Sequence, residues 1–217
     1  PPPPPPPPPP PAPAPPPALH LMTRRQRQMC IRDRPNTSSE VLLVAMPGVG
    51  DVGKLAIDAV NGELDAEPIA RIIHPSLPPL AKLDENGLLV PPHILLSRIE
   101  VDGKHVYTLT GDAQPMTPEG QHELAISVLE MFSGGEIMVL AGMSASAERK
   151  EVFSITSCAS YRIELESKGV DVRRGEPEAG VIGLAALITA LGPLKNVKTS
   201  CIIAVSYTHL RAHETRP

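Results

Sequence analysis

Apolar residues in this chain occur in short runs separated by turns rich in glycine and proline, and the first such run is Val41–Met46. A short, fully apolar run of this kind predicts a buried strand. Pro47–Gly50 then predicts a turn, and Asp51 is placed to cap a helix from about Val52 to Leu64. Strand, glycine turn and helix in this order are typical of the opening unit of a parallel α/β domain. One face of the expected helix is apolar and comprises Val52, Leu55, Ala56, Ala59 and Val60.

The middle of the chain predicts a β-hairpin inserted between parallel units. Ile94–Val101 and Lys104–Thr110 flank Asp102-Gly103, a dipeptide typical of two-residue turns. An earlier strand is expected over Glu67–Ile73, and it ends at His74-Pro75 because proline cannot donate a hydrogen bond to a ladder.

The second half of the chain predicts further helices and strands. Thr117 is placed to cap a helix whose first position is Pro118. Ile137–Ala141 is fully apolar, as expected of a central parallel strand. The helix after Pro118 has a buried stripe of Leu124, Ala125, Val128, Met131 and Phe132. The other expected elements are strands at Leu88–Val90, Val152–Thr156, Val170–Val172 and Val197–Ala204, and helices at Cys158–Lys168 and Ala179–Leu191, the last with Gly180 and Gly183 on one face. The predicted fold class is α/β, a mostly parallel sheet with helices on both faces and an inserted hairpin.

The glycine turn matches parts of two nucleotide-binding motifs. Gly48-x-Gly50-x-x-Gly53 fits the dinucleotide fingerprint, but the next strand ends at His74-Pro75 and lacks the acidic residue that would hold the ribose. Gly48-x-x-x-x-Gly53-Lys54 fits most of a phosphate-binding loop, but the next residue is Leu55, which has no oxygen for Mg²⁺. The favoured interpretation is structural: the glycines allow a tight turn and a close approach of strand and helix.

The two ends of the chain differ from this domain. Residues 1–17 are almost all proline, which favours a stiff or disordered tail. Gln28–Asp33 can be encoded by CAGATGTGTATAAGAGAC, and the reverse complement encodes the string found at Val205–Leu210. The two flanks therefore resemble translated sequencing adapter. We expect residues 1–34 and 205–217 to be tails, and residues 35–204 to form a single α/β domain that is truncated at its C-terminus.

Without the flanks, the domain is acidic. Residues 35–204 contain 13 lysines and arginines and 22 aspartates and glutamates, which gives a net charge of −9, against −4 for the whole chain. An acidic domain without tryptophan lacks both the positive charge and the stacking side chains that nucleic-acid binding needs. The sequence shows no membrane-spanning run and no signal peptide. We therefore expect a cytoplasmic protein that binds neither nucleic acid nor membrane.

No group of residues points to catalysis or to a metal. The histidines of the domain lack the spacing of metal ligands, and scattered surface or loop positions are expected for them. Cys158 and Cys201 are far apart and also lack metal spacing, so reduced thiols are expected. The histidines are His74, His93, His105 and His122. No catalytic, cofactor-binding or metal-binding residue is predicted.

Several motifs nevertheless follow one another in a fixed order: PGVGDVGKLA at 47–56, the His74-Pro75 loop, LTGDAQPMTPEGQ at 109–121, Ala141-Gly142 and the segment Gly180–Gly183. This order resembles the archaeal members of the proteasome assembly chaperone family, whose pattern is a P-G-x-G-x-V-G turn, a T-G-D-x-Q-P stretch and a G-x-x-G helix. The family-motif residues, structural or binding, are Gly48, Gly50, Asp51, Gly53, Pro75, Gly111, Asp112, Gln114, Pro115, Gly120, Gly142, Gly180 and Gly183.

The resemblance implies a function in protein binding. It implies a fold related to the nucleoside phosphorylase and hydrolase class, a homo-oligomer, and binding of proteasome α-subunits without enzymatic activity or a cofactor. Several similar proteins carry a C-terminal hydrophobic–Tyr–any-residue tail that docks between α-subunits, and the flank at 205–217 leaves no such tail to read. The alternative is a small-molecule enzyme or nucleotide binder on the same phosphorylase-like fold, because a fold does not decide a function.

Overall fold

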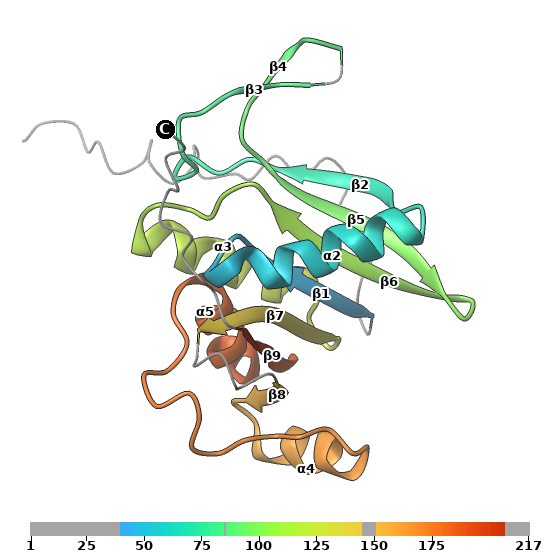
Figure 1. The fold of residues 1–217 in the computed structure, drawn as a ribbon, viewed down its shortest axis with the longest axis vertical. Helices are drawn as coiled ribbons and strands as arrows, with labels where there is room; N and C mark the ends of the chain where they lie inside the picture. Colours follow the sequence, from blue (N-terminus) through green and yellow to red (C-terminus); the bar gives the residue numbers. More distant parts are fainter. Residues whose placement is uncertain (1–39, 85, 145–150, 207–217) are drawn as a thin grey trace, which may run out of the picture.

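The computed structural model describes residues 40–84, 86–144 and 151–206, and these form a seven-stranded sheet with helices packed on it (Figure 1). The order of the strands in the sheet is β2-β5-β6-β1-β7-β9-β8. The strands are β1 (Val41–Ala45), β2 (Glu67–Ile72), β5 (Ile94–Val101), β6 (Lys104–Gly111), β7 (Glu136–Ser144), β8 (Glu151–Thr156) and β9 (Lys198–Ser206), and β3 (Lys82–Leu83) with β4 (Leu89–Val90) forms a separate pair. The helices are α2 (Val52–Glu63), α3 (Pro118–Met131), α4 (Ala159–Ser167) and α5 (Gly183–Leu191), with short 3₁₀ turns η1 (Val49–Asp51) and η2 (Gly192–Lys195).

The sheet is mixed, with its parallel strands at the centre. β6, β1, β7 and β9 pair in parallel, whereas β5 and β8 run in the opposite direction. β5 and β6 form the expected hairpin, and its turn residues Asp102 and Gly103 both have positive φ, at 51° and 73°. The predicted class is confirmed: an α/β fold with a mostly parallel sheet and an inserted hairpin.

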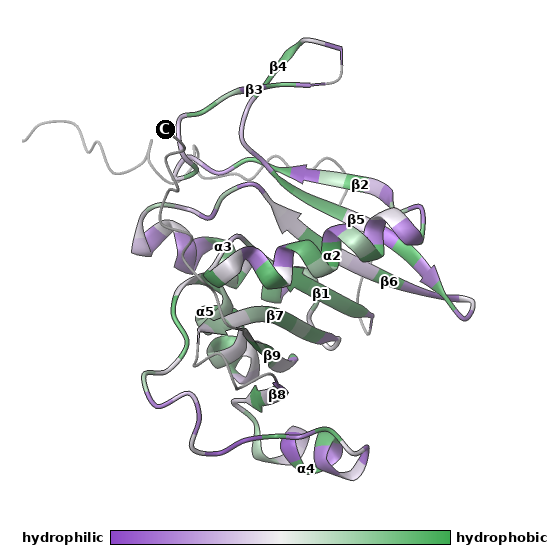
Figure 2. Cartoon of the chain, viewed as in Figure 1, coloured by the Kyte–Doolittle hydropathy of each residue, from purple (hydrophilic) through white to green (hydrophobic). Residues whose placement is uncertain are grey.

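Helices cover both faces of the sheet (Figure 1). α2 lies on one face, above β1, β6 and β7, and α3 and α5 pack against each other on the opposite face. Apolar side chains of the central strands join α3 and α5 in one core, and β1 and β7 are coloured hydrophobic along much of their length (Figure 2). α3 begins as predicted, with the Thr117 hydroxyl accepting a hydrogen bond from the Gly120 N–H at 3.1 Å.

The prediction for the buried face of α2 is wrong. The buried residues are Gly53 and Ile57, whereas Leu55, Ala56 and Ala59 are exposed. The rotation of the helix is set by Gly53, which lies against the backbone of β7 and brings Ile57, one turn later, onto the sheet. Asp51 does not cap the helix through its side chain, because its carboxylate instead accepts a hydrogen bond from the Gly48 N–H.

Three other expected elements differ. β2 points in the same direction as β1, but it lies at the sheet edge and pairs antiparallel with β5, so it is not the neighbour of β1 that a dinucleotide fold requires. Val172 makes only an isolated bridge with Ser154 in place of the strand expected at Val170–Val172. α5 begins at Gly183 and not at Ala179 as expected. Gly180 and Gly183 have φ of 73° and 77°, and positive φ angles do not fit a right-handed helix running from Ala179 through both glycines.

The last strand extends two residues beyond the expected domain boundary. β9 continues to Ser206, and Val205 is buried in the core. The tails at 1–34 and 207–217, and the polar loop residues 145–150, lie outside the described residues.

Candidate functional site

A pocket of about 660 Å³ lies at the carboxyl ends of β1 and β7. The glycine turn forms one side of it, and the loop before α5 forms the other. This is the edge of an open α/β sheet at which ligands commonly bind. Seven of the family-motif residues line the pocket: Gly48, Asp51, Gly53, Gln114, Gly142, Gly180 and Gly183.

Two glycines allow the backbone of β7 to come close to α2 and to η1 beside this pocket. A Cβ atom on Gly53 would lie 2.4 Å from the carbonyl oxygen of Leu140. A Cβ atom on Gly142 would lie 2.3 Å from the carbonyl oxygen of Val49. Contacts this short do not occur for real side chains, so both positions require glycine for close packing.

The glycine turn itself contains two successive left-handed residues, Gly50 at φ 63° and Asp51 at φ 51°. The Gly48 N–H donates to Asp51 Oδ1 at 3.1 Å, which closes the turn. Gly48 has an extended φ of −165° and open space around it, so it does not need to be glycine for steric reasons. Gly50 supports the turn but is not among the residues that line the pocket.

Gln114 holds the two sides of the pocket together. Its Nε2 donates to the Pro47 carbonyl oxygen at 2.6 Å, and its Oε1 accepts a hydrogen bond from the Leu184 N–H at 3.3 Å. The same oxygen would lie 3.1 Å from a Cβ atom on Gly183, so glycine leaves room for the amide. The T-G-D-x-Q-P stretch thus connects the glycine turn to the first residues of α5.

We expect Gln114→Leu to lower the free energy of unfolding by about 1–2 kcal/mol, because leucine keeps the side-chain volume but leaves the half-buried partners of two hydrogen bonds unpaired. Urea unfolding measures this difference. Gln121→Leu is the matched control, since its amide donates only to the Pro115 carbonyl oxygen in the described structure. An equal loss in both variants would contradict the bridging role of Gln114.

Three other family-motif residues, Pro75, Pro115 and Gly120, lie outside the pocket in a second cluster at the start of α3. A Cβ atom on Gly120 would lie 2.5 Å from the Ser76 side chain, and the Met116 N–H donates to the Ser76 carbonyl oxygen at 2.7 Å. The exposed Pro75 belongs to this docked loop, and the buried Pro115 accepts the hydrogen bond from Gln121. The cluster fixes the loop after β2 onto α3.

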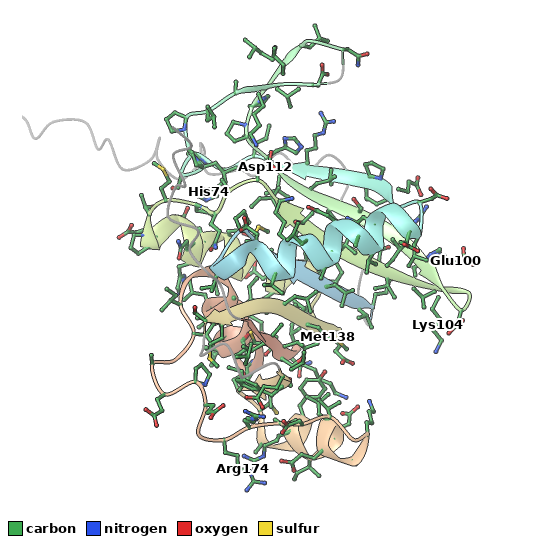
Figure 3. All side chains as sticks on the ribbon, viewed as in Figure 1. His74, Glu100, Lys104, Asp112, Met138 and Arg174 are labelled. Carbon is green, nitrogen blue, oxygen red and sulfur yellow. The ribbon has the colours of Figure 1, made fainter. Side chains whose placement is uncertain are left out.

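Gly111 and Asp112 end β6 on the same side of the molecule. Gly111 packs against the backbone of His93 and Ile94 in β5. Asp112, labelled in Figure 3, makes an ion pair with Lys82 at 2.9 Å, and the hydrogen bond from Lys82 lowers the pKa of the carboxyl group. Asp112 therefore anchors the β3–β4 segment.

His74 lies in the loop after β2, which is one of the kinds of position expected for the histidines. It is buried, its Nδ1 accepts a hydrogen bond from the Ser76 N–H at 3.1 Å, and its Nε2 lies 3.4 Å from a carboxylate oxygen of Glu123. The ring thereby links the loop after β2 to α3, which is a structural role (Figure 3).

The charged side chains that the structure describes around the pocket do not complete a phosphate site. Lys54 directs its Nζ to Asp58 Oδ2 at 2.5 Å, and it is not among the residues that line the pocket. Asp51 is the only ionisable side chain among the described residues that line the pocket. No group of three or more histidine, cysteine, aspartate or glutamate residues in the described ranges could hold a metal ion.

The two cysteines of the domain lie in different environments. Cys158 precedes α4, and a hydrogen bond with Ser160, with sulfur and oxygen 3.1 Å apart, lowers the pKa of its thiol. Cys201 lies in the core, where burial raises the pKa of its thiol to about 12. Neither lines the pocket.

Several residues that line the pocket are not among the predicted family-motif residues: Met46, Met143, Ile182 and Gln121. Gln121 and Ile182 lie inside two of the motif segments, and Met46 and Met143 adjoin motif residues. In the described ranges, no helix combines the length and apolar character that a membrane crossing requires.

Solved structures with this fold include proteins linked by name to the proteasome. The archaeal proteasome activator PbaB of Pyrococcus furiosus matches with a TM-score of 0.71 and 21% identity, over 84% of this chain and 81% of that one. PbaA of the same organism, an archaeal homologue of proteasome-assembly chaperone, matches with a TM-score of 0.64 and 21% identity, over 80% of this chain and 74% of that one. At this identity the likeness shows a shared fold.

Sequence comparison assigns the family. An uncharacterized protein of Methanocaldococcus jannaschii is 20% identical over 176 residues, which cover 80% of this chain and 68% of that protein. The model of the PAC2 family matches residues 42–214, which include the pocket and both motif clusters. The expected resemblance to proteasome assembly chaperone proteins is confirmed, and the chain belongs to the PAC2 family.

Proposed function

We propose that this protein binds proteasome α-subunits as a homo-oligomer in the cytoplasm and assists proteasome assembly, without catalysing a reaction. The family assignment and the likeness to PbaB and PbaA support a chaperone-like role. The observation in the structure that favours protein binding is an exposed apolar segment.

The segment is the leucine arm, residues 80–84 and 86–90, which contains the two-residue strands β3 and β4 and stands away from the sheet (Figure 1). Its four leucines are between 59% and 71% exposed: Leu80, Leu83, Leu88 and Leu89. A pair of strands this short is not stable by itself in water, and exposed apolar side chains gathered in one segment favour an interaction site. The arm therefore suits contact with a second copy of the chain, which would cover its leucines.

We expect the full chain to self-associate at tens of micromolar, a concentration at which interfaces of ordinary size are occupied. Replacing Leu83 and Leu89 together with serine removes two apolar side chains and should weaken association at least tenfold. Light scattering across a dilution series measures the dissociation constant. Ile163→Ser with Leu194→Ser is the matched control, since these residues are 62% and 76% exposed but lie elsewhere. A monomeric wild-type chain would contradict the homo-oligomer.

Binding to the proteasome is tested separately. Purified archaeal proteasome α-subunits are titrated with the full chain at physiological salt, because an acidic domain attracts basic surfaces more strongly when salt is low. The proposal expects saturable binding that persists at this salt concentration. Failure of an oligomeric, folded chain to bind α-subunits would overturn the chaperone role and leave self-association standing.

A further inference from the structure

We propose that the pocket between the glycine turn and the start of α5 binds an uncharged, mainly apolar small molecule. This site does not depend on contact with proteasome subunits, because its lining comes from the carboxyl ends of β1 and β7 and from two loops that face each other.

The size and walls of the pocket suit such a ligand. Its volume of about 660 Å³ lies within the range of pockets that hold small molecules, which are mostly lined by apolar side chains with a few polar groups. Its floor is apolar, with Val44, Val139 and Ile203 from neighbouring parallel strands. Gln114 and Gln121 supply neutral amide groups in the wall near Gly183.

The charges select against anions. Among the described residues of the lining, no lysine, arginine or histidine is present, and the one ionisable group is the carboxylate of Asp51. Among the described residues, an anionic ligand would therefore meet the like charge of the exposed Asp51 carboxylate and no basic side chain. A neutral ligand has no such cost.

The rim of the pocket exposes apolar side chains on both sides. Ile182, in the loop before α5, is 86% exposed, and Val49, in the glycine turn, is 45% exposed. Both line the pocket, and the loop that carries Ile182 is flanked by Gly180 and Gly183 at positive φ. An apolar molecule in the pocket would cover side chains that otherwise face water.

Two fluorescent probes that differ in one charged group test the proposal on the full chain. N-phenylnaphthylamine is neutral, and anilinonaphthalenesulfonate is the same ring system with a sulfonate. We expect the neutral probe to bind with one site per chain and at least tenfold more tightly than the sulfonate. Absence of saturable binding of the neutral probe, or equal affinity for both probes, would overturn the proposal.

Variants then locate the site. Gly48→Leu adds a side chain to the lining at a position with extended φ and nothing nearer than the Met46 carbonyl oxygen at 3.8 Å, so the chain can fold with the pocket partly filled. It should weaken the neutral probe at least tenfold. Gly62→Leu adds the same side chain on α2, where a Cβ atom meets no neighbour within 4 Å, and should leave binding unchanged.

A second variant covers the case in which Gly48→Leu perturbs folding. Ile182→Asn alters only an exposed rim side chain, and it should weaken the neutral probe severalfold while thermal unfolding stays at the wild-type temperature. Wild-type affinity in both Gly48→Leu and Ile182→Asn would place the probe elsewhere and refute the assignment.

Discussion

Gly53→Ala is expected to lower the free energy of unfolding by about 3 kcal/mol, because its new methyl group meets the backbone of Leu140 and the helix has to move away from β7. The contact of 2.4 Å involves a carbonyl oxygen in the middle of the sheet, which cannot swing aside as a flexible side chain would. Urea unfolding measures the loss of free energy. If the slope of the free energy against urea concentration is the same in both proteins, their values can be compared directly.

The same helix provides a control of opposite sign. Gly62 also lies in α2, but a Cβ atom there meets no neighbour within 4 Å. Gly62→Ala should therefore raise stability by about 0.5–1 kcal/mol through helix propensity alone. Stabilisation by Gly53→Ala as well would contradict the close contact between α2 and β7 at this position.

Phe132→Ala is expected to cost about 3–5 kcal/mol, since it removes a large buried side chain and leaves a cavity in the main core. Phe132 is 1% exposed at the end of α3, and its ring meets the Tyr107 ring of β6 edge to face, with centroids 5.6 Å apart. The substitution therefore loosens α3 from the sheet.

Calorimetric unfolding measures the cost of Phe132→Ala. Phe132→Leu keeps most of the apolar volume and should cost less than about 1.5 kcal/mol. Leu194→Ala, at a side chain that is 76% exposed, should change stability by no more than about 0.5 kcal/mol. Equal effects of Phe132→Ala and Leu194→Ala would show that Phe132 is not part of the core.

The elements that depend only on residues close together in the sequence were predicted correctly. Asp102-Gly103 predicted the hairpin because few other dipeptides accept two positive φ angles. Thr117 and Pro118 predicted the start of α3 because the cap acts within one turn. Elements of this kind can be predicted without knowing which other elements they pack against.

Features that depend on tertiary contacts were predicted poorly. The apolar pattern of α2 favoured Leu55 and Ala59 as its buried face, but the backbone contact at Gly53 turns these residues outward. Gly180 and Gly183 have helical spacing in the sequence, yet their positive φ angles place them at the ends of a loop. In both cases glycine acts through the conformation or the proximity it permits, which a hydropathy pattern does not record.

The motifs in the sequence include much of the pocket lining, but they do not explain why these residues come together. The order of motifs singled out seven residues that the fold brings together from four separate segments of the chain. The reason that Gln114 belongs to this set appears only when its amide is seen between Pro47 and Leu184. Ile182 lies inside the Gly180–Gly183 segment, but its place at the apolar rim was not predicted, because the motif fixes only the two glycines.

The effects of replacing Gly53 and Gly142 are coupled, because both glycines lie where β7 comes close to the segment from Val49 to Gly53. Each glycine faces a carbonyl oxygen of the opposite segment, Leu140 for one and Val49 for the other. A displacement of the helix that relieves a methyl group at the first site also opens space at the second, so the two costs are not independent. We therefore expect replacement of both glycines with alanine to cost less stability than the sum of the two single replacements.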